Sequence, residues 1–170
     1  LTGVILNARI KMIRVQSRFI EQISYKAQNI DELFAHFNRY DSLRYSVAWI
    51  DCTAAGNKLG RGVLMTGDFL KNGELNGYNT GNHSKFNIPV FLPSWLINPL
   101  LLKLFNTLYF HLSSLDERKR VVVNLNKFFF PLDQMLNWNR LYGRQGFLQY
   151  QFVLPIKNSR DGIKKILNII

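Results

Sequence analysis

The sequence predicts an α+β domain, in which an antiparallel sheet is covered by helices on one side. Three observations lead to this prediction. Strand pairs joined as hairpins outnumber regular strand–helix–strand units, amphipathic helical stretches separate the strands, and hydrophobic residues make up 47% of the chain. Because 170 residues suffice for one buried core, we expect a single domain over residues 1–170.

The first half of the chain predicts two strands, a helix and a two-stranded hairpin. Alternating residues over 4–15 and 17–27 are typical of strands. Residues 29–40 begin with Asn, carry Glu three positions later and repeat apolar residues at helical spacing, so they predict a capped amphipathic helix. Residues 44–52 and 62–68 predict the two strands of a hairpin, because a glycine-rich turn separates them.

The middle of the chain contains an unusually apolar helix. The Gly- and Asn-rich stretch 71–85 predicts a mobile loop before it. Residues 98–112 open with Asn-Pro, which suits a helix start, and are apolar almost all round. This helix is too short for a confident membrane span, so it is either buried or meets something outside this chain.

The last part predicts alternating strands and helices. Residues 118–130 predict a strand with a basic start, and residues 131–143 predict a short helix opened by proline and closed near glycine. Residues 146–155 read as a strand, because their side chains alternate between two faces. Residues 158–170 carry an apolar stripe and predict a final helix.

The chain is strongly basic, with 22 Lys and Arg against 11 Asp and Glu. A positive surface attracts nucleic acid, anionic lipid or phosphorylated substrates, although a solvated basic surface gives the same count. The basic, glycine-containing stretch 56–62 could bind phosphate, but a simple hairpin turn is the commoner explanation.

The sequence gives little support for a metal site or for a catalytic nucleophile. His36, His83 and His111 have no metal-ligand spacing, so we expect no metal site. The single cysteine, Cys52, excludes an intramolecular disulfide and is better explained as a small packed residue than as a nucleophile.

Two glutamines and a tryptophan are the candidate binding residues. On a strand, Gln149 and Gln151 share one face roughly 7 Å apart, where their amides could hold the hydroxyls of a sugar. A solvent-facing strand gives the same pattern. Trp49 shares a strand face with Tyr45 and Val47, where its indole either packs in the core or walls a site for a ring-shaped ligand.

Four segments, in a fixed order, carry a family resemblance. They are LTGVI at 1–5, YSVAWID at 45–51, KLGRGVLMTGD at 58–68 and the long match at 131–155. The set resembles the FAD-dependent decaprenylphosphoryl-β-D-ribose 2-oxidase family, within the vanillyl-alcohol-oxidase-like flavoproteins. The resemblance implies that the chain is an incomplete substrate-binding cap domain. FAD would be bound mainly by a domain absent from this chain, and the chain alone would be inactive.

The resemblance also implies a reaction and its partners. A hydride passes from C2 of a polyprenylphosphoryl ribose to flavin N5, and a partner reductase then reduces the ketone, which epimerises ribose to arabinose for the cell envelope. The expected partners are the sugar-lipid phosphate, the reductase and a membrane surface, with no nucleic acid. The expected location is the cytoplasm, or the periphery of the inner membrane.

Five residues match positions of the family's substrate site. Gln149 and Gln151 match the glutamines at the sugar pocket, and Trp49 matches a tryptophan that faces both flavin and substrate. Leu132 matches a pocket-lining leucine, and Phe129 stands where the family has a tyrosine, so that hydroxyl contact is missing. The resemblance places no catalytic residue within this chain. It also implies that the apolar helix at 98–112 lies near the pocket mouth, where it meets the polyprenyl tail or the membrane.

Three alternatives remain open. The first is a FAD-linked oxidase of another sugar or an aldonolactone, without a lipid carrier. The second is a basic nucleic-acid-binding module, which predicts steep salt dependence of binding. The third is a non-catalytic interaction domain that uses the apolar helix.

Overall fold

A computed structural model describes most of the chain. The described residues are 3–70, 86–93, 98–113, 119–144 and 146–170. The mobile loop expected at 71–85 therefore lies outside the described residues.

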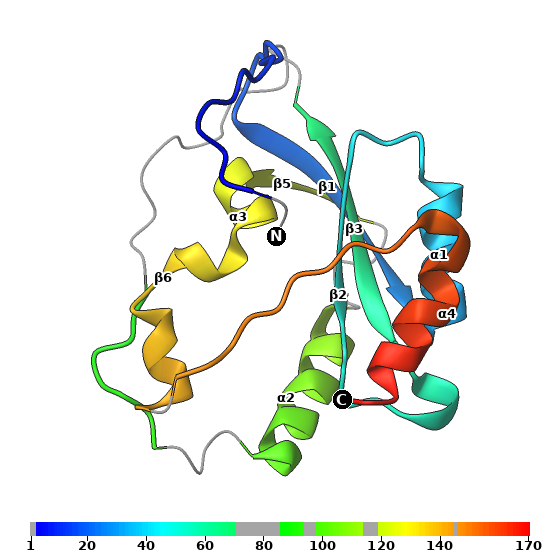
Figure 1. The fold of residues 1–170 in the computed structure, drawn as a ribbon, viewed down its shortest axis with the longest axis vertical. Coiled ribbons are helices and arrows are strands. Elements are labelled where there is room, and N and C mark those ends of the chain that lie inside the picture. The colour runs from blue at the N-terminus through cyan, green and yellow to red at the C-terminus, as the bar shows by residue number, and fades with distance from the viewer. Residues whose placement is uncertain (1–2, 71–85, 94–97, 114–118, 145) are drawn as a thin grey trace.

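Among the described residues, an antiparallel four-stranded sheet forms the centre of the fold, in the order β2-β3-β1-β5 (Figure 1). Its strands are β1 (Phe19–Ala27), β2 (Tyr45–Ile50), β3 (Gly62–Phe69) and β5 (Arg120–Asn124). The predicted hairpin is β2 and β3, which pair directly. The predicted α+β class is confirmed.

The register assigns each strand residue to one of two faces, because directly opposite residues of an antiparallel pair point the same way. On the first face, Tyr25 lies opposite Leu64. On the second face, Ile20 lies opposite both Phe69 and Val123. Each face has its own core cluster, so the helices cover both faces of the sheet and not one as expected.

Two helices cover the first face, and Figure 1 shows them side by side. They are α1 (Ile30–Arg39) and α4 (Ile156–Leu167). Leu33 of α1 is 1% exposed and packs in the same cluster as Leu167 of α4. At the surface, Asp31 of α1 pairs with Arg160 and Lys164 of α4, which lowers the pKa of that carboxyl.

The start of α1 confirms the predicted cap. The Asn29 side-chain oxygen accepts hydrogen bonds from the backbone N–H groups of Asp31 and Glu32, both at 3.0 Å. The Glu32 carboxylate accepts from the backbone of Gln28 at 2.6 Å. These bonds satisfy N–H groups that a helix start leaves without partners.

The second face carries helices at both ends of the sheet. They are α2 (Pro99–Leu112) and the short α3 (Leu125–Phe129). Phe128 of α3 packs against Ile20 and Val123, and Tyr109 of α2 packs against Trp49. As predicted, the Asn98 side chain caps α2 by accepting from Leu101.

The connection between β2 and β3 is a tight loop that includes a 3-10 turn, Gly56–Lys58. Gly60 has a φ of +71°, in the left-handed region that favours glycine, and a β-carbon there would lie 2.7 Å from Cβ of Ile30. The Leu59 carbonyl accepts from the backbone N–H of Ile30 at 2.8 Å. The loop is therefore fixed against the start of α1.

Three expected strands are wrong in whole or in part. The segment 4–15 is exposed and forms no strand, because it pairs with no described strand. The strand expected at 118–130 ends at Asn124, whose side chain accepts from the backbone of Asn126 and caps α3. The segment 146–155 also forms no strand among the described residues. Alternation alone does not make a strand, since the backbone needs a partner edge.

The two helices expected after residue 130 also differ from the structure. Residues 131–143 form two 3-10 turns, Pro131–Gln134 and Trp138–Tyr142, separated by β6 (Met135–Leu136). Between the turns, Asn137 adopts a left-handed φ of 57°, which interrupts a continuous helix. β6 pairs in parallel with β4 (Phe86–Asn87). The last helix begins at Ile156 rather than at residue 158 and ends at Leu167.

Candidate functional site

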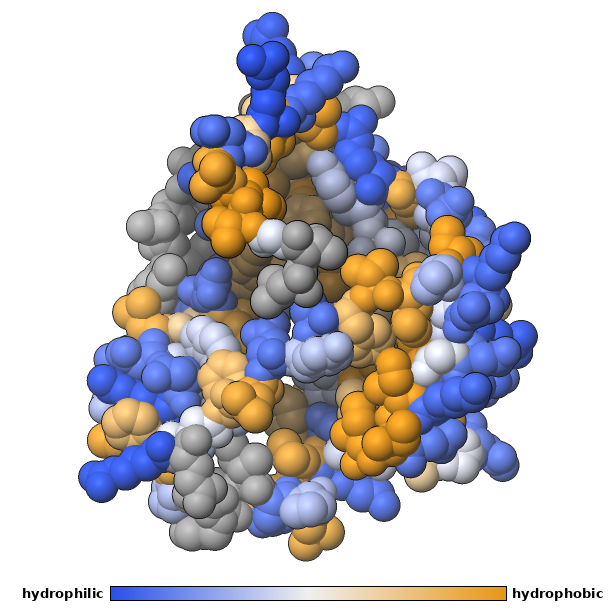
Figure 2. Space-filling view, in the orientation of Figure 1, coloured by the Kyte–Doolittle hydropathy of each residue, from blue (hydrophilic) through white to orange (hydrophobic). Residues whose placement is uncertain are grey.

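A cavity of about 410 Å³ lies on the second face of the sheet, between α2 and α3. Val47, Met65 and Val121 form its floor from three strands, and Tyr109 and Phe128 border it from the two helices. Figure 2 shows hydrophobic residues both at the surface and lining the hollowed centre of the molecule in that view. A concave, mostly apolar site with few polar groups is typical of small-molecule binding.

Trp49 is the predicted site residue that the structure places in this cavity. It lies opposite Val63 in the sheet, on the same face as Tyr45 and Val47 as predicted. Its indole is half-buried and packs on Tyr109 with a centroid separation of 4.7 Å and an interplanar angle of 57°. The indole therefore forms an aromatic wall held between the sheet and α2.

The polar groups of the cavity come from β1. Gln22 and Ser24 point to the second face, and the Gln22 amide donates to the Ser24 hydroxyl at 3.2 Å. Sequence reasoning missed this pair, although both are polar residues two positions apart on one strand face, which Lys26 continues. Lys127 of α3 adds a positive charge to the cavity lining.

Phe129 and Leu132 lie beside the cavity and are not among its lining residues. Phe129 is half-buried and packs edge-on against Tyr45 at 5.1 Å and Phe128 at 4.9 Å. Leu132 is 44% exposed, one residue after Pro131, which does line the cavity. Their position is close to the predicted pocket, but Phe129 is mainly part of the second core cluster.

Gln149 and Gln151 are not brought to Trp49. Both are exposed, and so are their neighbours Leu148 and Tyr150, on the opposite side of the predicted strand. The expected wall of paired amides is therefore absent from the cavity of the described residues. Because the segment has no partner strand here, nothing aligns its glutamines with the sheet face.

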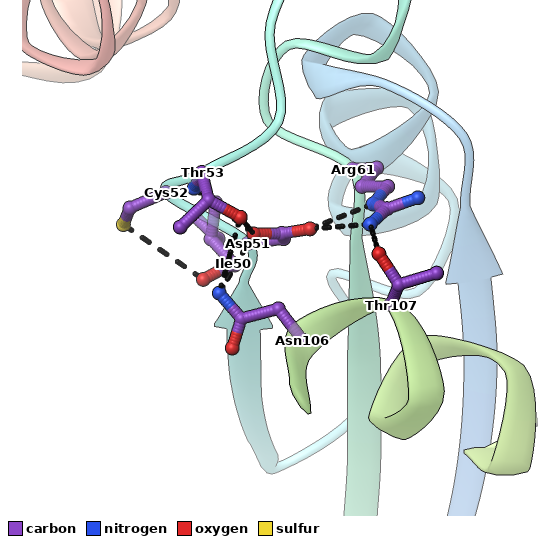
Figure 3. A network of polar contacts seen from close by, with 7 residues as sticks. All are labelled: Ile50, Asp51, Cys52, Thr53, Arg61, Asn106 and Thr107. Carbon is purple, nitrogen blue, oxygen red and sulfur yellow. Dashed lines mark hydrogen bonds and ion pairs between the residues drawn. The ribbon is translucent and has the colours of Figure 1, made fainter. Parts of the chain in front are cut away.

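A buried polar network holds α2 against the sheet (Figure 3). Asp51 is fully buried, and Nε and Nη2 of Arg61 donate to its Oδ2, each at 2.7 Å. Thr53 and Asn106 donate to the other oxygen at 2.6 and 2.8 Å, and Arg61 also donates to Thr107 at 2.8 Å. Asn106 and Thr107 belong to α2, so this network fixes the helix that carries Tyr109.

The network sets the charge of Asp51. Burial raises the pKa of this carboxyl, but hydrogen bonds from Thr53, Arg61 and Asn106 outweigh it, and the pKa lies below its ordinary value. Its neighbour Cys52 is exposed rather than packed as expected. Partial desolvation and the negative charge of Asp51 raise the pKa of the Cys52 thiol, which disfavours the nucleophilic thiolate.

Among the described residues there is neither a metal-binding cluster nor a membrane-spanning helix. No group of three or more His, Cys, Asp or Glu side chains there could hold a metal ion, and His83 lies outside them. No described helix combines the length and the apolar character needed to cross a membrane.

The sequence comparisons include a match to a curated oxidase. No protein-family model matches the chain. The decaprenylphosphoryl-β-D-ribose oxidase of Mycolicibacterium smegmatis is 33% identical to it over 163 residues, which covers 91% of this chain. Over most of its length, the chain is therefore similar to this oxidase. This confirms the resemblance drawn from the four segments. The match covers 35% of the oxidase, so the chain spans about a third of the length of its relative.

Proposed function

We propose that this chain is a substrate-binding part of a FAD-dependent oxidase that converts the C2 hydroxyl of a polyprenylphosphoryl ribose to a ketone. The observation that carries the proposal is the match to decaprenylphosphoryl-β-D-ribose oxidase over 91% of the chain. The apolar cavity with an indole wall and few polar anchors supports it, because such a site can position a sugar and exclude water.

The lining of the cavity fits one face of a flavin ring. The Trp49 indole offers a flat aromatic surface, and Val47 and Met65 offer an apolar floor. Bound FAD would supply the hydride acceptor for the reaction. In this proposal, Trp49 contacts the ring system, while a region outside residues 1–170 binds most of the cofactor.

Because another region would bind most of the cofactor, we expect the 170-residue chain by itself to bind FAD weakly, with a Kd above about 1 μM, and to show no turnover. The isolated cavity offers one wall of a ring site and cannot enclose the whole cofactor. Titration of the chain into FAD, followed by flavin fluorescence, measures this affinity. Submicromolar binding would show that the chain holds the cofactor unaided.

The sugar would be held by side-chain amides. We propose that Gln149 and Gln151 bind the ribose hydroxyls in the complete oxidase, with Leu132 and Phe129 closing the apolar side of the site. Since Phe129 lacks a hydroxyl, it can pack against the sugar but cannot donate to it. This feature favours, as a second candidate, oxidation of a different sugar or an aldonolactone, which flavin bleaching by candidate substrates distinguishes.

In the complete oxidase, Gln151→Ala is expected to lower kcat/KM for the polyprenylphosphoryl ribose about tenfold or more and to leave the FAD content unchanged. The loss corresponds to about one hydrogen bond made to the reacting sugar. Steady-state flavin reduction and the flavin-to-protein absorbance ratio measure the two quantities. The matched control is Gln28→Ala, which removes an exposed amide in the turn before α1.

The same assay on Gln22→Ala separates two arrangements of the site. If Gln151→Ala leaves kcat/KM unchanged and Gln22→Ala lowers it, the amide that holds the sugar is the one in the described cavity. Gln151 would then have no part in substrate binding.

The remaining partners follow from the substrate. A reductase would reduce the ketone product and complete the epimerisation. The exposed apolar side of α2, which includes Leu100, Leu104, Phe105 and Leu108, would contact the polyprenyl chain or the membrane in which the lipid resides. In this proposal the protein works in the cytoplasm, at the surface of the inner membrane, and we expect no nucleic-acid partner.

A further inference from the structure

A second cavity, of about 310 Å³, lies on the other side of α2, between this helix and the loop that joins β2 to β3. Lys103, Thr107 and His111 line it from α2, and Lys58 and Arg61 line it from the loop. The three helix residues are spaced by four and so form one stripe. This cavity shares no lining residue with the cavity at Trp49.

The charge of the second cavity is positive. Asp51 balances the charge of Arg61, since the two form a buried ion pair at 2.7 Å. Lys58 and Lys103 form no ion pair with a described acidic residue, and no described acidic side chain lines the cavity. Two lysines on opposite walls therefore border a common space without a counter-charge among the described residues.

The walls of this cavity are held in place before any ligand binds. Arg61 connects the buried Asp51 to the Thr107 hydroxyl, which fixes the loop to α2 (Figure 3). Because the Thr107 oxygen accepts from Arg61, its own proton can be donated to another acceptor. Thr107 is thus held in place before an anion binds, which lowers the conformational entropy lost on binding, while the exposed Lys58 and Lys103 would be ordered by the anion.

We propose that this cavity binds the phosphate group of a phosphate ester, with Lys58 and Lys103 as its charge partners and Thr107 as a hydrogen-bond donor. A tetrahedral phosphate can accept from donors on two facing walls at once, and lysine binds it as a point charge. The phosphate could belong to a soluble phosphate ester or to an anionic lipid headgroup. The proposal does not depend on the oxidase reaction, because it rests on the geometry of a separate cavity.

Calorimetric titration of the full-length protein with inorganic phosphate, at constant ionic strength, tests the site. We expect saturable binding that weakens at least tenfold in Lys58→Gln/Lys103→Gln. The matched control is Lys157→Gln/Lys165→Gln, which removes two exposed charges from α4 and should bind phosphate like the unmodified protein. Circular dichroism of each variant verifies that the fold is retained.

Co-sedimentation with vesicles separates the two sources of phosphate. For a lipid headgroup, the protein binds phosphatidylglycerol vesicles more tightly than phosphatidylcholine vesicles, and the Lys58/Lys103 variant loses this difference while the α4 control keeps it. For a soluble ester, phosphate binding depends on Lys58 and Lys103 but vesicle binding does not. If both variants match the unmodified protein in both assays, or if no phosphate or vesicle binding occurs, the cavity is not a phosphate site.

Discussion

Replacing Asp51 by Asn is expected to lower the free energy of unfolding by about 3–5 kcal/mol. The substitution keeps the size of the side chain but leaves the buried guanidinium of Arg61 without a counter-charge. It also weakens the bonds from Asn106 that attach α2. Urea unfolding, followed by tryptophan fluorescence, measures the change.

Two further variants identify the cause of this loss. Asp68→Asn removes an exposed carboxylate that pairs with Arg44 at 3.4 Å, and it should cost less than about 1 kcal/mol. Arg61→Met added to Asp51→Asn should recover part of the stability, since no unpaired buried charge then remains. Equal losses in Asp51→Asn and Asp68→Asn would contradict the assigned role of the buried pair.

The same network gives a pH dependence with a defined sign. The pKa of Asp51 is lowered in the folded protein, so its stabilising contribution is fully present above the ordinary Asp value of about 3.9. The contribution is lost as the pH falls through the lower, folded pKa. The stability difference between the unmodified protein and Asp51→Asn should therefore shrink below about pH 4.

The second large effect is expected for Leu33→Ala, which should lower the free energy of unfolding by about 2–5 kcal/mol. Leu33 is 1% exposed and packs in the cluster that joins α1, α4 and the first face of the sheet. Its loss leaves a cavity at the centre of this cluster. Thermal and urea unfolding measure the effect.

Leu104→Ala is the matched control, because it makes the same chemical change on a helix at a side chain that is 64% exposed. Leucine and alanine have similar helix propensities, so the change in unfolding free energy should stay within about 0.5 kcal/mol. A large loss at Leu104 would mean that the apolar side of α2 is buried in the protein as studied in solution.

Local signals in the sequence predicted much of the fold. The helix at 30–39 was predictable because its cap and its apolar spacing lie within a dozen residues. The β2–β3 hairpin was predictable because a glycine-rich turn separates two short strands. In contrast, whether residues 146–155 form a strand depends on a neighbouring strand with which they can pair. The sequence of the segment itself does not show whether such a strand is present.

The candidate site was harder to predict than the fold. Trp49 was found because a family motif contains it, and the register then placed it in the cavity. The bond between Asn106 and Asp51 joins residues 55 positions apart, and no spacing rule relates them. Such contacts arise only once the sheet has set which helix lies over which strand.

The polar attachment of α2 has a consequence for how the molecule opens. Apart from buried Phe110 and the contact of Tyr109 with Trp49, the helix is attached through hydrogen bonds of Asn106 and Thr107, and five of its six leucines are exposed. Detaching it would therefore expose little additional apolar area and would carry a small heat-capacity change. Amide hydrogen exchange can then detect the release of α2 as a separate opening of low free energy. This opening should occur at lower denaturant concentrations than the unfolding of the two core clusters of the sheet.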